Sequence, residues 1–205
     1  MTEQGTDEWL AERAGRITAS RFKDVIGVNK SGKFLKARDD YMMELAFERL
    51  SGSPKHSVSS QSMQWGTEAE PIAREAYELH TGLFVDETGL IIDPRYDFIG
   101  GSPDGLIDAD GIIEIKSPHD EKVHIRTWLE GMPDHHMPQV QGNMMVTGRH
   151  WCDFISFDPR QAKNYQLYVQ RIDRDDEYIN DLMNRLVNFE QELQFMIEKI
   201  TNRAA

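Results

Sequence analysis

Cysteine is nearly absent from this chain of 205 residues, which contains only Cys152. A single thiol excludes internal disulfides and any zinc site built from several cysteines. Because Cys152 lies in the apolar and aromatic run Trp151–Ile155, we expect it to pack on a strand as an unreactive side chain.

Long hydrophobic runs are absent as well. No apolar run approaches the ~20 residues of a membrane-spanning helix, and the acidic first residues, MTEQGTDEWLAERAG, lack the apolar segment of a secretory signal. The composition, with 39% hydrophobic and 28% charged residues, is ordinary for a globular protein of this length. We therefore expect one cytoplasmic domain over residues 1–205, without attachment to a membrane.

Positive charge is in short supply, and the formal net charge of −12 has the wrong sign for binding the phosphate backbone of nucleic acid. The imbalance is uneven. Residues 1–56 carry nearly equal numbers of basic and acidic side chains, whereas residues 57–205 carry twice as many acidic as basic ones. A protein that encloses its substrate needs only a locally basic lining, and carboxylates that bind a metal ion no longer repel phosphate. The charge thus weighs against nucleic-acid binding without excluding it.

The stretch Gly100–Pro118, GGSPDGLIDADGIIEIKSP, contains the most informative motif. Asp104 lies in a tight Ser-Pro-Asp-Gly turn, and the apolar run at residues 112–116 predicts a strand with a period of two. Glu114 and Lys116 then project from one face of that strand, while its isoleucines at alternate positions face a core. Two carboxylates and a lysine therefore converge.

Oxygen ligands of this kind suit Mg²⁺ or Mn²⁺, and a lysine beside the metal can hold an attacking water. The order Pro-Asp, hairpin, Glu-x-Lys matches the signature of PD-(D/E)xK nucleases. The alternative is a turn followed by an edge strand with a surface salt bridge between Glu114 and Lys116, because short strings of this kind recur by chance.

Periodicity and turn signals predict alternating helices and strands. The expected helices are Asp7–Ala14, a short helix capped by Thr18 or Ser20 and ending near Val25, Phe34–Leu50, Gln61–His80 with Pro71 inside it, Asp120–Glu130, Pro138–Val146 and Asp175–Thr201. The expected strands are Leu83–Glu87, Gly89–Asp93 and Asp97–Gly101, which form an antiparallel meander leading into residues 112–116, and then Trp151–Phe157 and Tyr165–Arg171. Ser51–Ser60 is expected to be a mobile surface loop.

This order predicts an α/β fold, a mixed sheet flanked by helices, with the core of a restriction-endonuclease-like PD-(D/E)xK protein. The last helix has a continuous apolar stripe, which we interpret as part of the core. The alternative is a subunit interface. Glu70 is set among apolar and small residues of its helix. It is either an ordinary solvated glutamate or a third carboxylate near the metal.

Four motifs in this order resemble the phage λ-type exonuclease family of viral recombination nucleases, nearly from end to end of the chain. They are Trp9-x-x-x-Arg13-x-Gly15-x-Ile17-Thr18-Ala19-Ser20, then Trp65-Gly66-x-x-x-Glu70, then Ser102-Pro103-Asp104-Gly105 with Glu114-Ile115-Lys116, and then Gln139-Val140-Gln141. The resemblance implies three parts: residues 1–60 as a helical part that contributes a 5′-phosphate pocket, residues 61–172 as the catalytic core, and residues 173–205 as a C-terminal helix.

The resemblance also implies a site for two Mg²⁺ or Mn²⁺ ions about 4 Å apart, which stabilise the attacking and leaving oxygens of a phosphodiester. Its expected ligands are Asp104, Glu114, the main-chain carbonyl of Ile115 and Glu70. Lys116 would position the water, and Gln139 would donate hydrogen bonds beside the metals.

A pocket for a 5′-terminal phosphate is implied in the N-terminal motif, with Arg13 as the charged group and Ser20 and Ser102 as hydroxyl donors. Arginine suits this role because its planar donors match phosphate oxygens. The alternative for Arg13 is an exposed arginine in a surface ion pair. Lys30 would contact the DNA groove and Met63 would wedge between the terminal bases, and Gln141 is the weaker candidate beside Gln139.

Three histidines, His119, His135 and His136, suggest a histidine-metal nuclease or a zinc site at first sight. Their spacing fits neither one helical face nor a zinc finger. We expect them in loops or at the surface, with His119 close enough to Lys116 to touch substrate.

The resemblance implies a Mg²⁺-dependent 5′-to-3′ exonuclease that digests one strand of linear double-stranded DNA to mononucleotides and leaves 3′ single strands for phage recombination. It implies a ring-shaped homotrimer around the DNA, a single-strand annealing protein as partner, and a phage or prophage origin in the bacterial cytoplasm. The alternatives are a PD-(D/E)xK endonuclease and a catalytically silent DNA-binding scaffold.

Overall fold

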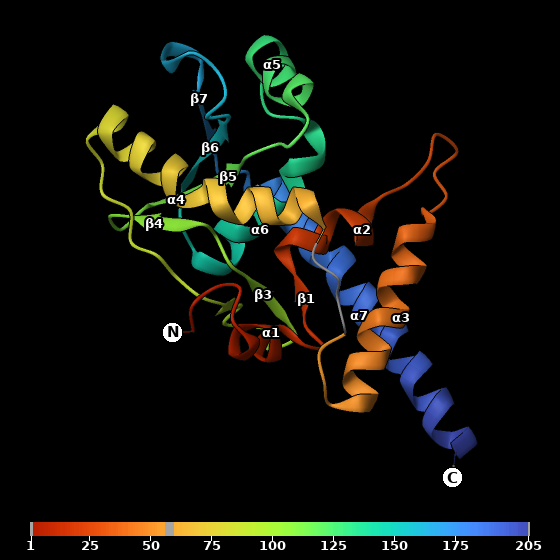
Figure 1. The fold of residues 1–205 in the computed structure, drawn as a ribbon. Helices are drawn as coiled ribbons and strands as arrows, with labels where there is room; N and C mark the ends of the chain where they lie inside the picture. Colours follow the sequence, from red (N-terminus) through yellow and green to blue (C-terminus); the bar gives the residue numbers. More distant parts are fainter. Residues whose placement is uncertain (1, 56–59, 205) are drawn as a thin grey trace.

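The structure is a computed structural model that describes residues 2–55 and 60–204 (Figure 1). Its mixed α/β architecture, with sheets flanked by helices, confirms the predicted fold class. The predicted loop Ser51–Ser60 lies partly outside the described residues. Among the described helices, none combines the length and the hydropathy needed to cross a lipid bilayer.

The strands form two sheets. The smaller sheet has the order β1-β3-β2, with β3 parallel to β1 and antiparallel to β2. The larger has the order β4-β5-β6-β7, in which the central pair β5 and β6 is parallel and both edge strands are antiparallel to their neighbours. The strands are β1 (Ile17–Thr18), β2 (Ile91–Ile92), β3 (Ile99–Gly101), β4 (Gly105–Ile107), β5 (Gly111–Lys116), β6 (Trp151–Phe157) and β7 (Leu167–Asp173).

The predicted meander is only partly right: β2 and β3 pair antiparallel as expected, but β3 and β5 belong to different sheets. Between β3 and β4 the chain leaves one sheet and enters the other within Ser102–Asp104, where Pro103 has no N–H to continue a ladder. The predicted strand Leu83–Glu87 contributes only a single bridge, in which Asp86 pairs with Leu106. The parallel pairs β1–β3 and β5–β6 thus join strands that lie far apart in the chain, which a sequence pattern does not specify.

Helices cover both faces of the larger sheet. Ala73 and Tyr77 of α4 pack on one face with Ile113 and Ile115 of β5. Val140 and Met144 of α6 pack on the other face with Cys152 and Phe154 of β6, where Cys152 is buried as predicted. The helices are α1 (Asp7–Arg13), α2 (Phe22–Ile26), α3 (Lys36–Ser51), α4 (Gln61–Thr81), α5 (Glu121–Glu130), α6 (Met137–Thr147) and α7 (Asp176–Ala204), and α4 runs through Pro71 without a break.

A third core joins α2, α3 and α7, which lie side by side in Figure 1. The apolar stripe of α7 is core, as predicted, because Ile179, Leu182, Leu186 and Leu193 are almost fully buried. Two ion pairs, Arg49 with Glu190 and Arg38 with Glu192, also connect α3 to α7. The long terminal helix is therefore part of the fold rather than an appendage.

Close packing at Gly142 gives a testable consequence for stability. An added Cβ at this position of α6 would lie 2.4 Å from Cε2 of Phe22, which is fully buried in α2. We expect Gly142→Ala to destabilise the protein by about 1–3 kcal/mol, because the aromatic ring must shift within a packed core. Urea denaturation measures this.

A matched control is Gly66→Ala in α4, where the added Cβ would meet no atom within 4 Å. It removes the glycine from a helix interior and is expected to stabilise the protein by up to about 1 kcal/mol. If Gly142→Ala were as stable as the parent, the close packing of α6 against α2 would be wrong.

Candidate active site

Asp104, Glu114 and Lys116 come together at the end of β5. The backbone N–H of Ile115 donates a hydrogen bond to Asp104 Oδ2 at 2.6 Å, and Lys116 Nζ donates to Glu114 Oε1 at 2.5 Å. Glu114 is fully buried, whereas Lys116 is half-buried. The alternative of a surface salt bridge between Glu114 and Lys116 on an edge strand is therefore wrong, because β5 lies between β4 and β6.

Asn143 is a member of this group that the sequence reasoning missed. Its Nδ2 donates to Glu114 Oε2 at 2.9 Å, and the whole residue is buried in α6. Its Oδ1 is buried and has no hydrogen-bond partner among the described residues. The available signal was the spacing of Gln139 and Asn143, since residues four apart share one face of a helix.

The electrostatics of the group are those of crowded carboxylates. Burial raises the pKa of Glu114 to about 7, although Lys116 opposes the rise and Asp104 adds to it. Burial also raises the pKa of Asp104. For Lys116, burial opposes the charged form, but the charges of Glu114 and Asp104 outweigh it and raise the pKa. The lysine is a cation beside two carboxyl groups that burial pushes toward protonation.

Glu70 belongs to the same electrostatic group. Burial raises its pKa to about 7, and the charge of Asp104 is the next largest cause of the rise. The two carboxyl groups are therefore within electrostatic reach of each other, although they come from α4 and from the turn before β4. Glu70 also forms an ion pair with Arg74 at 2.9 Å, one turn further along α4.

The donors fit a hard divalent cation in their chemistry. All the carboxyl groups supply oxygen, and a cation would relieve the repulsion that raises their pKa values. Within the described ranges, no three His, Cys, Asp or Glu side chains already form a metal-binding group.

A second polar cluster surrounds Arg13. Its guanidinium donates to Ser20 Oγ at 3.1 Å and to Ser102 Oγ at 3.5 Å, so the three residues predicted to form a pocket do come together. Two further members were missed. Thr18 Oγ1 accepts from Arg13 at 3.1 Å, and the Trp9 ring lies under the guanidinium, 4.2 Å from Cζ to the ring centroid.

The cluster can bind an anion. The Arg13 guanidinium donates hydrogen bonds to the neutral hydroxyls of Thr18, Ser20 and Ser102, and no carboxylate forms an ion pair with it in the part of the chain that the structure describes. Burial lowers the pKa of Arg13, yet a guanidinium remains charged in proteins. A half-buried cation with hydroxyl neighbours matches a phosphate group. The alternative of an exposed surface ion pair is wrong.

Of the three residues predicted to contact DNA, two lie at the surface. Lys30 is exposed in the turn after α2, and Met63 is 55% exposed in the first turn of α4. Gln141 is a correction: it is buried, its Nε2 donates to the Asp173 carbonyl at 2.9 Å, and its Oε1 accepts from the Asp175 N–H at 3.0 Å. This amide joins α6 to the start of α7 and has no free group for DNA. Gln139 is half-buried on α6.

The histidines lie near the site without forming a metal group. His119 is exposed and meets the Trp65 ring edge-on, with the centroids 6.1 Å apart. His135 is exposed, while His136 packs against Phe154 at 5.4 Å. Burial lowers the pKa of His136 to about 3, so this side chain is neutral at physiological pH.

Comparison with known proteins identifies relatives of the whole chain. Residues 8–150 match the YqaJ-like viral recombinase domain. The crystal structure of an alkaline exonuclease, LHK-Exo, from Laribacter hongkongensis is 41% identical over 97% of this chain and 98% of its own, with a TM-score of 0.89, and a second structure of LHK-Exo contains dAMP. These matches confirm the resemblance drawn from the four motifs.

Two more distant matches agree in fold or in sequence. A phage-related exonuclease from Haemophilus somnus 129PT shares the fold, with a TM-score of 0.69 and 18% identity over 90% of this chain and 96% of its own. An uncharacterized protein, R354, of Acanthamoeba polyphaga mimivirus is 24% identical over 82% of this chain. The chain spans only 31% of the length of R354.

Proposed function

Because the chain belongs to the YqaJ-like viral recombinase domain family, we propose that it is a Mg²⁺-dependent 5′-to-3′ exonuclease of linear double-stranded DNA. It releases mononucleotides and leaves 3′ single strands for homologous recombination. The observation that carries this proposal is the connection of two clusters: Ser102 belongs to the anion pocket of Arg13, and Asp104, two residues later, belongs to the carboxylate group. The 41% identity to an alkaline exonuclease supports it.

In this proposal the carboxyl groups of Asp104 and Glu114, the main-chain carbonyl of Ile115 and the carboxyl group of Glu70 would hold Mg²⁺. When bound, the ions supply Lewis-acid stabilisation of the charge that develops on the phosphodiester. The contacts of Ile115 described above are those of its N–H, so the role of its carbonyl stays a prediction. Asn143 holds one oxygen of Glu114 and so fixes the orientation of that carboxyl group.

Lys116 orients the attacking water. It is held by Glu114 Oε1, and its raised pKa keeps it protonated, so it acts as a donor and not as a base. Gln139 is a neutral side chain that donates hydrogen bonds to the phosphate. Removal of the water proton and protonation of the leaving 3′ oxygen complete the hydrolysis.

The anion pocket selects the DNA end. Arg13, Ser20 and Ser102 bind the 5′-terminal phosphate, and Thr18 adds a hydroxyl. Lys30 contacts the groove and Met63 wedges against the terminal base pair. A homotrimeric ring around the duplex would place the nearly neutral N-terminal part inside, with its lysines and arginines, and the acidic remainder outside, which reconciles the net charge of −12 with DNA binding. A single-strand annealing protein would take up the 3′ strand.

The test is nucleotide release from linear duplex DNA labelled at either the 5′ or the 3′ end. With Mg²⁺ we expect early release of the 5′ label as a mononucleotide, and with EDTA in place of Mg²⁺ we expect no release. The reason is that the metal stabilises the negative charge that develops on the phosphate in the transition state, and no other group does so to a comparable extent. Earlier release of the 3′ label, or full activity in EDTA, would contradict the proposal.

Closed circular DNA is the control that separates the exonuclease from an endonuclease of the same fold. An endonuclease needs no end and no 5′-phosphate pocket. Efficient cutting of closed circles would therefore favour the endonuclease, and an intact circle beside a degraded linear duplex supports the proposal.

A further inference from the structure

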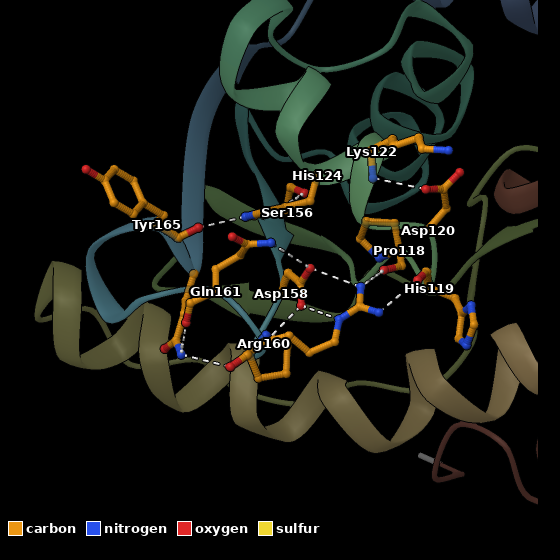
Figure 2. Close-up of polar contacts among 12 residues, drawn as sticks. Pro118, His119, Asp120, Lys122, His124, Ser156, Asp158, Arg160, Gln161 and Tyr165 are labelled. Carbon is orange, nitrogen blue, oxygen red and sulfur yellow. Dashed lines mark hydrogen bonds and ion pairs between the residues drawn. The ribbon is translucent and has the colours of Figure 1, made fainter.

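Arg160 lies in the turn between β6 and β7 and connects this turn to the segment that follows β5 (Figure 2). Its Nε and Nη2 donate to the two oxygens of Asp158 at 2.8 and 3.0 Å. Its Nη1 donates to the carbonyl of His119 at 3.0 Å, and its Nη2 also donates to the carbonyl of Pro118 at 3.3 Å. Pro118 and His119 directly follow the catalytic end of β5.

The same guanidinium reaches α4. Its Cζ lies 4.8 Å from the centroid of the Trp65 ring, and Trp65 in turn meets the ring of His119. Trp65 precedes Glu70 by five residues. Arg160 thus contacts α4, which carries Glu70, and the segment that follows β5, the strand that carries Glu114.

The start of α4 depends on this contact. The buried residues of α4 are Ala69, Ala73 and Tyr77, and the first two turns, residues 61–68, contain no buried residue. Trp65 is half-buried and is the large aromatic side chain of these turns. Stacking of Arg160 on Trp65 therefore holds a segment that has little other packing, and this segment also carries Met63.

The turn itself is closed by hydrogen bonds between Arg160 and Asp158. Asp158 is fully buried and accepts hydrogen bonds from the Arg160 backbone N–H at 3.0 Å and from its side chain. Burial opposes the charge of Asp158, but the hydrogen bonds of Arg160 outweigh it and lower the pKa of Asp158. Four of the five N–H donors of the guanidinium are used within the protein, so little remains to bind a phosphate of the DNA.

We propose that Arg160 is a positioning residue that sets the spacing between α4, which carries Glu70, and the end of β5, which carries Glu114 and Lys116. The inference rests on the proposed function, because it assigns Arg160 to the spacing of the metal-binding carboxyl groups. Arg160 touches neither substrate nor metal, and it acts through the Trp65 ring and the two carbonyls that follow Lys116.

The test compares Arg160→Gln and Arg160→Lys with Arg171→Gln. Arg171 is a matched control, because it also forms a bidentate ion pair, with Asp153 at 2.8 Å, and also stacks on a tryptophan, Trp151, at 3.6 Å. Its contacts lie within β6 and β7 and include neither Trp65 nor the segment after β5. Both glutamine variants thus lose the same kinds of interaction at different places.

Two readouts are needed. The first is the affinity of the protein for Mn²⁺ without DNA, measured from the electron paramagnetic resonance signal of free Mn²⁺. The second is kcat and KM for degradation of linear duplex DNA. For Arg160→Gln we expect Mn²⁺ affinity and kcat to fall about 10- to 100-fold, the range for residues that orient metal ligands. KM for DNA changes little, because the phosphate pocket is made by other elements. Arg160→Lys keeps the charge and part of the contacts, and is expected to lose less.

Equal Mn²⁺ affinity in Arg160→Gln and the parent would overturn the inference, as would an equal loss in Arg171→Gln. Thermal melting shows whether each variant folds. If Arg160→Gln does not fold, Arg160→Lys is compared with the parent in its place. If the parent binds Mn²⁺ and degrades DNA, and the Arg160 variants do so equally well, only the role of Arg160 is refuted. A parent that neither binds Mn²⁺ nor degrades DNA refutes the proposed function and, with it, this inference.

Discussion

Asp104→Asn is expected to reduce nucleotide release by about three orders of magnitude. Metal ions stabilise the transition state of phosphodiester hydrolysis by several kcal/mol, and each 1.36 kcal/mol corresponds to about a factor of ten in rate. The substitution removes the negative charge that binds the cation and keeps the shape of the side chain. Single-turnover release of nucleotides from 5′-phosphorylated linear duplex measures the effect.

The same variant is expected to fold normally. Asparagine retains an oxygen that can accept the hydrogen bond from the Ile115 N–H, and burial already disfavours the charged form of Asp104. Thermal melting without metal should therefore show no loss of stability. Asp110→Asn is the matched control, because Asp110 is exposed in the turn between β4 and β5. A parent-like rate in folded Asp104→Asn would favour the silent-scaffold alternative.

Arg13→Ala is expected to abolish the preference for 5′-phosphorylated over 5′-hydroxyl ends. Hydrogen bonds to a charged group contribute roughly 1.5–3 kcal/mol each, so the parent should prefer the phosphorylated end by about 10- to 100-fold. The variant should degrade both ends at the rate that the parent shows for the 5′-hydroxyl end. Competition between differently labelled duplexes that differ only in the 5′ group measures the ratio directly.

Arg16→Ala is the control for this experiment. Arg16 lies three residues away, but its Nε donates to the Asp97 carbonyl at 2.9 Å, away from the hydroxyl cluster. Its loss should leave the preference intact. A phosphate preference that survives Arg13→Ala would show that the cluster around Arg13 is not the end-binding pocket.

Local structure could be predicted from the sequence where the signals were local. Trp151–Phe157 was predicted with the observed bounds, because a run rich in apolar and aromatic residues followed by Asp-Pro marks both strand and end. The helix beginning at Gln61 was equally clear, since Ser60 caps it and Gly82 ends it in a left-handed conformation. The assignment of strands to two sheets was not predictable, because it depends on pairing between distant residues.

The site shows the same limit. The motifs placed Asp104, Glu114 and Lys116 together because they lie within one turn and strand. Asn143 was missed because its contact with Glu114 joins residues 29 positions apart, and Arg160 because its partners outside its own turn are more than 40 positions away. Thr18 was expected to cap a helix, yet it forms no capping hydrogen bond, and its hydroxyl accepts from Arg13.

The passage between the two sheets has a consequence for the position of cleavage. The segment between the two sheets is Ser102–Asp104. Ser102 follows β3 and belongs to the anion pocket, and Asp104 precedes β4 and belongs to the carboxylate group. Two residue steps span at most about 7 Å, a length on the order of one nucleotide. In the proposed reaction, this short covalent link through Pro103 would keep the end-binding residue and the metal-binding residue close together, which would favour cleavage near the bound 5′ end.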